Sequence, residues 1–336
     1  ILGNPSIHWE VATKQNFGID YSFLGGLIAG SLEFFSENRH DILVDGGDRS
    51  IPTYFGAKAP TANLGKTKSH GYEFELRLSK TISGVHMWGN FNMTHAVNKI
   101  VFKDDPILKP AYQKQAGYAI GQDHANLTTG FANTWDQVYG MTEFKTNENQ
   151  KLPGSYTVID YNGDGVIDSN DSAPYGYTGT PENTYSASIG AEWKGWSFYV
   201  QFYGVSNVDR YVAFNSLGKT LDTVFDEGTL WSKYTTDADA PMPRINSTPS
   251  YYEGTRFHYD GSFIRLKNAE IAYNFTGPWV KKLGVSSIRV FLNGNNLWVW
   301  SRMPDDRESN FAGTGLASQG AYPTVKRFNL GLKINL

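Results

Sequence analysis

Residues 160–171 combine acidic and amide side chains with glycines at a spacing suited to binding a cation. They read D-Y-N-G-D-G-V-I-D-S-N-D, which matches the ligand pattern of a twelve-residue calcium loop. A glycine stands at the sixth position, where the backbone of such a loop turns sharply. Ca²⁺ takes about six to eight oxygen ligands, and this segment nearly supplies that set. The predicted ligands are Asp160, Asn162, Asp164, the backbone carbonyl of Val166, Asp168 and Asp171.

The ion bound by this segment is expected to have a structural role and not a catalytic one. An oxygen cage fastens a loop, whereas a catalytic ion needs an open coordination position and a nearby base. One departure from the pattern is Asp171, which stands where helix-loop-helix calcium sites usually have a bidentate Glu. The alternative is a metal-free turn, because Asn-Gly and Asp-Gly pairs favour tight turns by themselves.

Other residue groupings give no sign of an enzyme. The seven histidines are scattered without metal-ligand spacing, the G-x-S-x-G nucleophile motif is missing, and the chain has no cysteine. The acidic pairs 104–105 and 305–306 resemble the two carboxyl groups that a glycosidase needs. Sequence neighbours on a strand point to opposite faces, so these pairs are better explained as solvated loop charges. We therefore expect no catalytic residues.

The elements that would position the loop are β-strands. Apolar and polar residues alternate strictly in stretches of about ten residues, and 15% of the 336 residues are aromatic. No apolar run reaches the roughly eighteen residues of a transmembrane helix. The alternation predicts nine strands, near residues 13–23, 28–34, 71–79, 85–101, 185–193, 196–203, 263–275, 288–300 and 328–336.

The connections between these strands alternate between short and long. Short turns fall near 24–26, 80–84, 194–195 and 276–287, and long connections near 45–70, 103–182, 207–262 and 301–322. Short turns at one rim and long loops at the other are typical of an outer-membrane barrel. Sandwiches and propellers also have alternating strands, but loops this long are uncommon in compact soluble domains. The sequence predicts an all-β, membrane-spanning antiparallel barrel.

Charge and chain ends narrow the prediction. A net charge of −3 provides no basic surface for nucleic acid. Residues 1–10 contain no signal-peptide pattern and no initiating Met. Single-chain bacterial barrels have an even number of strands, so nine predicted strands are fewer than a whole barrel. We expect the chain to be part of a longer polypeptide.

Three passages resemble one protein family. They are the opening stretch 2–21, the calcium-type loop 160–171, and the final stretches 263–275, 291–297 and 321–332. In this order they resemble the C-terminal part of SusC-like (SusC/RagA) TonB-dependent transporters of the Bacteroidetes outer membrane. The resemblance implies a plugged barrel of about 22 strands, of which residues 1–336 would form the last nine. Residues 103–182 would then be a long extracellular loop that contains the calcium segment.

The resemblance also implies a function. Members import large nutrients, such as oligosaccharides or peptides, across the bacterial outer membrane as multi-pass proteins. Energy comes from TonB through an N-terminal part without a counterpart in these residues, and the partner is a SusD-like surface lipoprotein. A departure is the final Leu336, where such barrels commonly end in an aromatic residue. The alternatives are a secreted, calcium-stabilised carbohydrate-binding β-domain and a receptor that signals without transport.

Aromatic side chains in the long connections are candidate substrate contacts, because aromatic faces pack on sugar rings and on peptide side chains. Packing within the loops is the competing explanation for each of them. The candidates are Trp135, Tyr139, Trp231, Tyr234, Tyr251 and Tyr252. Tryptophans near strand ends are expected in the membrane-interface girdle or the barrel wall. They are Trp88, Trp193, Trp196, Trp279, Trp298 and Trp300.

Overall fold

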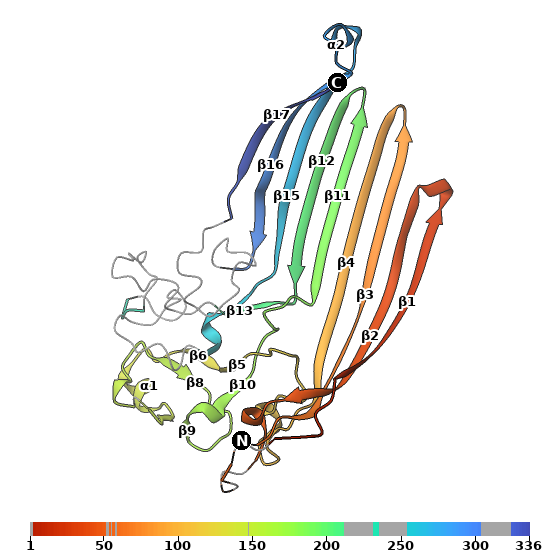
Figure 1. Cartoon of the computed structure of the whole chain (residues 1–336). Coiled ribbons are helices and arrows are strands. Elements are labelled where there is room, and N and C mark those ends of the chain that lie inside the picture. Colours follow the sequence, from red (N-terminus) through yellow and green to blue (C-terminus); the bar gives the residue numbers. More distant parts are fainter. Residues whose placement is uncertain are drawn as a thin grey trace.

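A computed structural model describes residues 3–51, 54, 56–57, 59–146, 148–211, 231–234, 254–303 and 324–336. Its main element is one nine-stranded sheet in which every neighbouring pair is antiparallel, in the order β1-β2-β3-β4-β11-β12-β15-β16-β17 (Figure 1). The nine predicted strands are therefore confirmed. Their bounds are β1 Val11–Phe23, β2 Ile28–Val44, β3 Ala62–Ile82, β4 Val85–Phe102, β11 Asn183–Trp193, β12 Trp196–Ser206, β15 Phe263–Phe275, β16 Ser287–Ser301 and β17 Arg327–Asn335.

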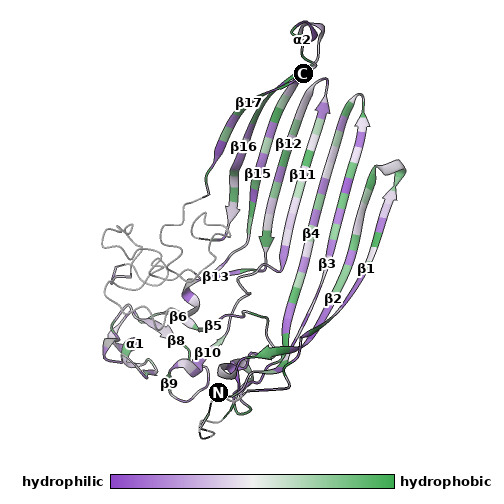
Figure 2. Cartoon of the chain, in the orientation of Figure 1, coloured by the Kyte–Doolittle hydropathy of each residue, from purple (hydrophilic) through white to green (hydrophobic). Residues whose placement is uncertain are grey.

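One face of this sheet is apolar from strand to strand. The register places Ile19 opposite Leu32 and Leu32 opposite Phe74, and the apolar residues of later strands continue this face. Figure 2 shows the resulting alternation of hydrophobic and hydrophilic residues along each strand. These side chains are open to their surroundings, with Ile189 57% and Leu330 79% exposed. An apolar face of this extent needs a hydrophobic environment to cover it.

The opposite face is polar, and its side chains bond across strands. Asn295 Nδ2 donates to Asn268 Oδ1 at 2.5 Å, and Asn268 Nδ2 donates to Gln201 Oε1 at 2.7 Å. Nearby, the Arg289 guanidinium donates to Glu270 Oε1 at 2.7 Å. Cross-strand pairs of this kind stabilise a sheet and fix its register, because a slip of one residue would exchange the two faces.

The two ends of the sheet differ as predicted. The C-terminus lies at the end with the short turns, and the N-terminus lies among the long connections (Figure 1). No helix in the described part of the chain is long and apolar enough to cross a membrane. The short connections are 24–27, 83–84, 194–195 and 276–286, and the long ones are 45–61, 103–182, 207–262 and 302–326.

The first long connection is shorter than predicted. We expected a loop over 45–70, but β3 begins at Ala62, nine residues before the predicted start at 71. The added residues include K-T-K-S-H at 66–70, which lack apolar alternation, so the sequence pattern does not mark them as strand. They extend the ladder with β2, where Lys68 lies opposite Asn38 and His70 opposite Ser36.

The longest connection, 103–182, has its own small core. Phe131, Phe144, Tyr156 and Ile167 are buried together, and Trp231 from the next long connection packs against them. Its elements pair as three two-stranded ribbons, β10-β5, β6-β8 and β7-β9. The bounds are β5 His124–Asn126, β6 Thr128–Phe131, α1 Trp135–Tyr139, β7 Glu143–Phe144, β8 Tyr156–Val158, β9 Val166–Ile167 and β10 Ser172–Pro174.

Two further elements complete the described part of the chain. A two-stranded ribbon, β13 Asp209–Tyr211 with β14 His258–Asp260, joins the two ends of the connection between β12 and β15. A one-turn helix, α2 Pro278–Lys282, lies in the short connection between β15 and β16. The all-β prediction holds apart from one-turn helices such as α1 and α2.

Candidate functional site

The predicted calcium segment 160–171 lies between β8 and β10, and Asp160 organises its first turn. The two carboxylate oxygens of Asp160 accept three backbone N–H groups, from Gly163 at 2.7 Å, Asp164 at 3.2 Å and Gly165 at 2.8 Å. Gly163 and Gly165 have φ angles of 74° and 87°, in the left-handed region that glycine adopts without strain. The glycines therefore allow the backbone to wrap around the first carboxylate.

The next two predicted ligands continue this pattern. Asn162 Oδ1 accepts the Asp164 N–H at 2.9 Å, and Asp164 Oδ1 accepts the Val166 N–H at 2.9 Å. Asn162 and Asp164 are exposed, and Asp160 and Val166 are half-buried. These four residues are thus more exposed than the last two predicted ligands, Asp168 and Asp171, which are buried.

Asp171, the last predicted ligand, is fully buried. Its Oδ1 accepts N–H groups from Tyr161 at 2.8 Å and Asn162 at 3.4 Å, and its Oδ2 accepts the Asp168 N–H at 2.7 Å. A buried carboxylate is tolerated only when such hydrogen bonds replace its hydration. Asp171 thus joins the two ends of the segment, because its carboxylate accepts backbone N–H groups from other residues of the same segment.

Asp168 is also held by protein donors. Its Oδ2 accepts from Lys145 Nζ at 2.8 Å, and its Oδ1 accepts the Asn170 N–H at 2.6 Å. The Lys145 hydrogen bond, followed by the Asn170 N–H, holds the pKa of Asp168 below its usual value. Asp168 therefore keeps its charge in the folded loop at pH values where a free carboxyl group is already partly protonated.

This pair gives a pH prediction. The pKa of Asp168 is lowered on folding. The ion pair therefore stabilises the loop fully at pH values above the usual aspartate pKa of 3.8, and this stabilisation is lost as the pH falls through the lowered pKa. Lys145→Met should lower loop stability at pH 7 by less than about 1 kcal/mol, because Lys145 is 64% exposed. Hydrogen exchange of residues 143–171 at pH 7 and near pH 3 measures this. An equal loss at both pH values would contradict the assignment.

The donor set of the segment matches calcium in part. Asp160, Asn162, Asp164 and the Val166 carbonyl are oxygen donors of the kind that Ca²⁺ prefers, on residues that are exposed or half-buried. Asp168 and Asp171 are buried, at 7% and 0% exposure, and Asp168 also accepts from Lys145. A bound ion would therefore be held mainly by the first four residues, with Asp168 available only if Lys145 moves away.

The chain matches a known family over most of its length. The sequence model of one protein family, described as "TonB dependent receptor-like, beta-barrel", matches residues 1–297. The chain belongs to this family. Its nine-stranded sheet is part of a TonB-dependent receptor barrel, and the prediction that the chain is not an enzyme agrees with a family of transporters.

Named relatives of this TonB-dependent receptor chain agree with the resemblance seen in its sequence. TonB-dependent receptor P3 of Formosa agariphila is 24% identical over 99% of this chain and 35% of its own length. TonB-dependent receptor SusC of Bacteroides thetaiotaomicron is 25% identical over 98% of this chain and 32% of its own length. The chain thus spans about a third of the length of these relatives.

A solved structure has the same fold. The RagAB peptide importer in its open-open state superposes with a TM-score of 0.71 at 17% identity, over 99% of this chain and 35% of that chain. Another RagAB peptide transporter structure gives a TM-score of 0.70 over 100% of this chain and 36% of that chain. At this identity the likeness establishes the fold of the receptor barrel.

Among the predicted substrate contacts in this receptor chain, Trp135 and Tyr139 form an exposed aromatic pair. Their rings stack at 5.8 Å between centroids on α1, and they are 50% and 79% exposed. The helix is fixed by a capping box between Thr134 and Gln137. Two exposed, stacked rings have the geometry that packs on sugar rings or peptide side chains.

The other predicted contacts are arranged differently. Trp231 is half-buried against the loop core and donates Nε1–H to Asn133 Oδ1 at 2.6 Å, so it packs the two long connections together. Tyr234 is exposed and lies against Lys233. The remaining two, Tyr251 and Tyr252, lie outside the described residues.

The tryptophans predicted for the girdle or wall lie on both faces of the receptor sheet, except Trp279, which lies on α2 in the short connection. Trp88 stands on the polar face, with its ring tilted against that of Tyr199 at 5.8 Å between centroids and lying over Gly190. A Cβ at Gly190 would lie 2.4 Å from the Trp88 ring, so glycine is required there. Trp196 belongs to an aromatic group at the short-turn end with Tyr273. Trp193, Trp196, Trp279, Trp298 and Trp300 are all more than two-fifths exposed.

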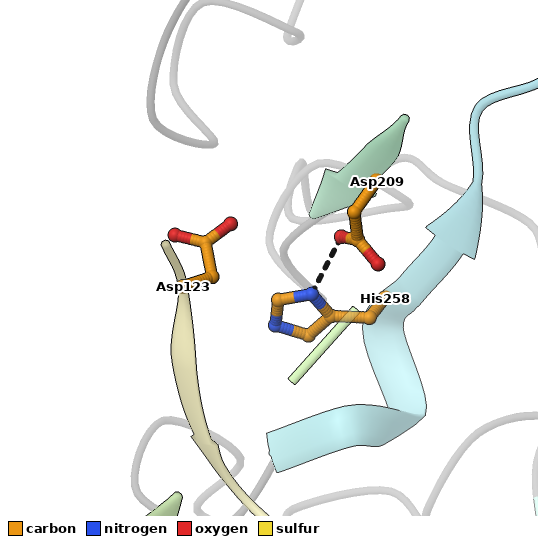
Figure 3. A group of neighbouring side chains, drawn as sticks. All are labelled: Asp123, Asp209 and His258. Carbon is orange, nitrogen blue, oxygen red and sulfur yellow. Dashed lines mark hydrogen bonds and ion pairs between the residues drawn. The ribbon is translucent and has the colours of Figure 1, made fainter. Parts of the chain in front are cut away.

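One cluster was missed by the sequence analysis. Within the described part of the chain, the acidic and histidine side chains that bring three ligand atoms within 4.8 Å of one another are Asp123, Asp209 and His258 (Figure 3). They come from segments far apart in the sequence, and the histidines appear scattered in the linear chain. Only the pairing of β13 with β14 brings Asp209 and His258 together, and no sequence signal marked those three-residue strands.

Proposed function

We propose that this chain forms part of the wall of an outer-membrane barrel that imports large nutrients with energy from TonB. The observation that supports this most directly is the two-faced sheet, with one continuous apolar face across its strands and one polar, hydrogen-bonded face. A secreted soluble domain would leave the apolar face in water, whereas a barrel places it against lipid. Membership of the TonB-dependent receptor family supports the same conclusion.

In this proposal the polar face lines the barrel interior. Gln201, Asn268 and Asn295 form one hydrogen-bonded row, and Glu270 pairs with Arg289 beside it. Fixed polar groups suit a passage for hydrophilic cargo and a surface on which a plug can rest. Coupling to TonB would require a plug and a TonB-contacting segment, which relatives about three times as long have room to contain.

The long connections then lie outside the cell. There they would meet a SusD-like surface lipoprotein, and cargo would reach the exposed Trp135–Tyr139 pair on α1. We propose a glycan or a peptide as cargo, because aromatic faces pack on both. The RagAB structure that shares this fold is described as a peptide importer, which supports the peptide class, and the glycan class rests on the aromatic contacts alone.

Calcium would have a local role in this receptor. Asp160, Asn162, Asp164 and the Val166 carbonyl would hold Ca²⁺ and so fix the segment next to the loop core, where Ile167 is buried. The ion would stabilise the loop without taking part in transport chemistry.

The calcium proposal predicts a specific loss. The double substitution Asp160→Ala with Asp164→Ala should abolish calcium-dependent protection of residues 143–171 against protease and leave the barrel assembled. The measurement is limited proteolysis of the full-length protein with added calcium and with a chelator. Wild-type protein that is cleaved equally in both conditions would contradict calcium binding. Failure of barrel assembly would contradict a local role.

Import is tested in cells. A strain that lacks the gene should lose uptake of one glycan or peptide from a defined set, and the full-length gene should restore it only when TonB is present. Co-purification of a surface lipoprotein with the tagged receptor tests the partnership separately. Unchanged uptake of every compound, together with a protein absent from the outer membrane, would refute the proposed function.

The aromatic pair gives a prediction for cargo binding. Trp135→Ala with Tyr139→Ala should weaken uptake at low cargo concentration by about tenfold, since each ring contributes about 0.5–1.5 kcal/mol beyond its buried area. Maximal uptake at saturating cargo should stay near wild type. Tyr54, which is 90% exposed in a different connection, provides the matched control Tyr54→Ala. An equal effect of both variants would show that the pair has no special role.

A further inference from the structure

A group of three side chains at the long-loop end of the sheet has the composition of a metal site. Asp123 comes from the connection between β4 and β11, and Asp209 and His258 begin the two strands of the β13-β14 ribbon. One ligand atom from each lies within 4.8 Å of the others. Figure 3 shows the two carboxylates on either side of the imidazole ring. Two long connections therefore meet at this point.

The imidazole of His258 is held in a fixed orientation. Its Nδ1 lies 2.7 Å from Asp209 Oδ1, and its ring packs against Tyr175 and Tyr211 at 5.4 and 5.1 Å between centroids. Its side chain is 5% exposed and that of Asp209 is 7% exposed. A carboxylate that accepts the Nδ1 proton leaves Nε2 as the ring atom with a free lone pair, as in metal-bound histidines.

The second ring nitrogen has no partner. Across the residues that the structure describes, no hydrogen bond reaches His258 Nε2, although the side chain is more than nine-tenths buried. Nε2 is not among the buried side-chain atoms that lack a partner in the described residues, so this nitrogen has contact with solvent and can be reached by a ligand. Asp123 is exposed, which leaves the cluster open to solvent on one side. An ion can therefore enter without unfolding the loops.

The charge of the cluster also favours a cation. Two carboxylates surround one imidazole, so with a neutral His258 the group has a charge of about −2. The neighbouring cation, Arg210, donates to the Gly179 carbonyl and makes no hydrogen bond to the three described cluster residues, although its charge interacts with that of Asp209. Imidazole nitrogen with carboxylate oxygen is the donor set preferred by Zn²⁺ and similar transition metals, whereas Ca²⁺ takes oxygen ligands.

We propose that Asp123 and His258, oriented by Asp209, bind a divalent transition-metal ion that fastens the connection 103–182 to the base of the connection 207–262. The site is separate from the predicted calcium segment in both position and donor type. It does not depend on what the receptor imports.

The test uses zinc with the full-length receptor after treatment with a chelator. Calorimetric titration should show one equivalent of Zn²⁺ bound to wild type, with affinity reduced at least about tenfold in His258→Ala and in Asp123→Asn. Asp209→Asn should lower affinity by about 10- to 100-fold, as is usual when the carboxylate that orients a ligating histidine is removed. Co²⁺ should give a visible absorption band that His258→Ala removes.

Two controls separate a metal site from a simple ion pair. Asp123 is exposed and makes no side-chain hydrogen bond with the described residues, so Asp123→Asn should leave the metal-free protein unchanged and remove only zinc-dependent protection against protease. His124→Gln changes an exposed neighbouring histidine and should leave zinc affinity at the wild-type value. The proposal is overturned if wild type binds no zinc, if binding depends on His124, or if Asp123→Asn binds zinc as tightly as wild type.

Discussion

Ile189→Arg should destabilise the folded receptor by about 2–4 kcal/mol in a lipid bilayer, the cost of an arginine facing the middle of the membrane. Ile189 stands near the centre of β11, on the apolar face, and is 57% exposed. Its partners across the sheet are Gly89 and Val200, which offer no counter-charge. Denaturant titration of the protein refolded into vesicles measures the loss.

The control for this variant is the same substitution at the preceding residue, Ser188. Ser188→Arg places the same side chain on the polar face, opposite Gln201 and Asn90, where water or polar groups can solvate it. We expect a loss below about 1 kcal/mol for Ser188→Arg. Equal losses for the two variants would mean that the faces are not divided between lipid and interior.

Asp171→Ala should open the loop while the sheet stays folded. The substitution leaves the N–H groups of Tyr161, Asn162 and Asp168 without their acceptor inside a buried site. At about 1–3 kcal/mol for an unsatisfied buried group, we expect a local loss of about 3 kcal/mol and roughly 100-fold faster amide exchange in 156–174. Hydrogen exchange with mass spectrometry resolves this segment from β11 and β12.

Asp136→Ala is the matched control for Asp171→Ala. Asp136 lies in the same long connection, at the exposed first turn of α1, and its side chain makes no hydrogen bond with the described residues. This variant should leave exchange in 156–174 near wild type. If Asp171→Ala also speeds exchange in β11 and β12 to the same degree, the loop is part of the barrel's folding unit and the local interpretation is wrong.

The bounds of a strand could be predicted from the sequence where one of its faces meets an apolar environment. The sequence pattern identified β15 at its observed bounds, because Ile271, Tyr273 and Phe275 alternate with polar or small residues in its second half. A register irregularity between Leu266 and Asn268 breaks the alternation earlier in the strand. The start of β3 was not predictable, since residues 66–70 are polar on both faces and only their pairing with β2 makes them a strand. The alternation of apolar and polar residues shows which face of a strand meets an apolar environment, whereas backbone hydrogen bonding to the neighbouring strand decides how long the strand is.

The sequence predicted those contacts of the loop site that join residues close together in the chain. The turn around Asp160 follows from the positions of Gly163 and Gly165, which the sequence alone reveals. The ion pair of Asp168 with Lys145 spans 23 residues and depends on the pairing of β7 with β9. Contacts between distant segments, such as Trp231 on the loop core, need the tertiary structure.

The central claim is that the apolar face of this sheet contacts lipid and the polar face lines an interior. Residues 1–336 contain no cysteine, so spin labels can be attached at single introduced cysteines along β12, from Phe198 to Gln201, once any cysteine elsewhere in the receptor has been replaced by serine. In full-length protein in a bilayer, Phe198 and Val200 should be accessible to oxygen dissolved in lipid, and Tyr199 and Gln201 should not. Equal accessibility of all four labels to a water-soluble relaxing agent would contradict the account.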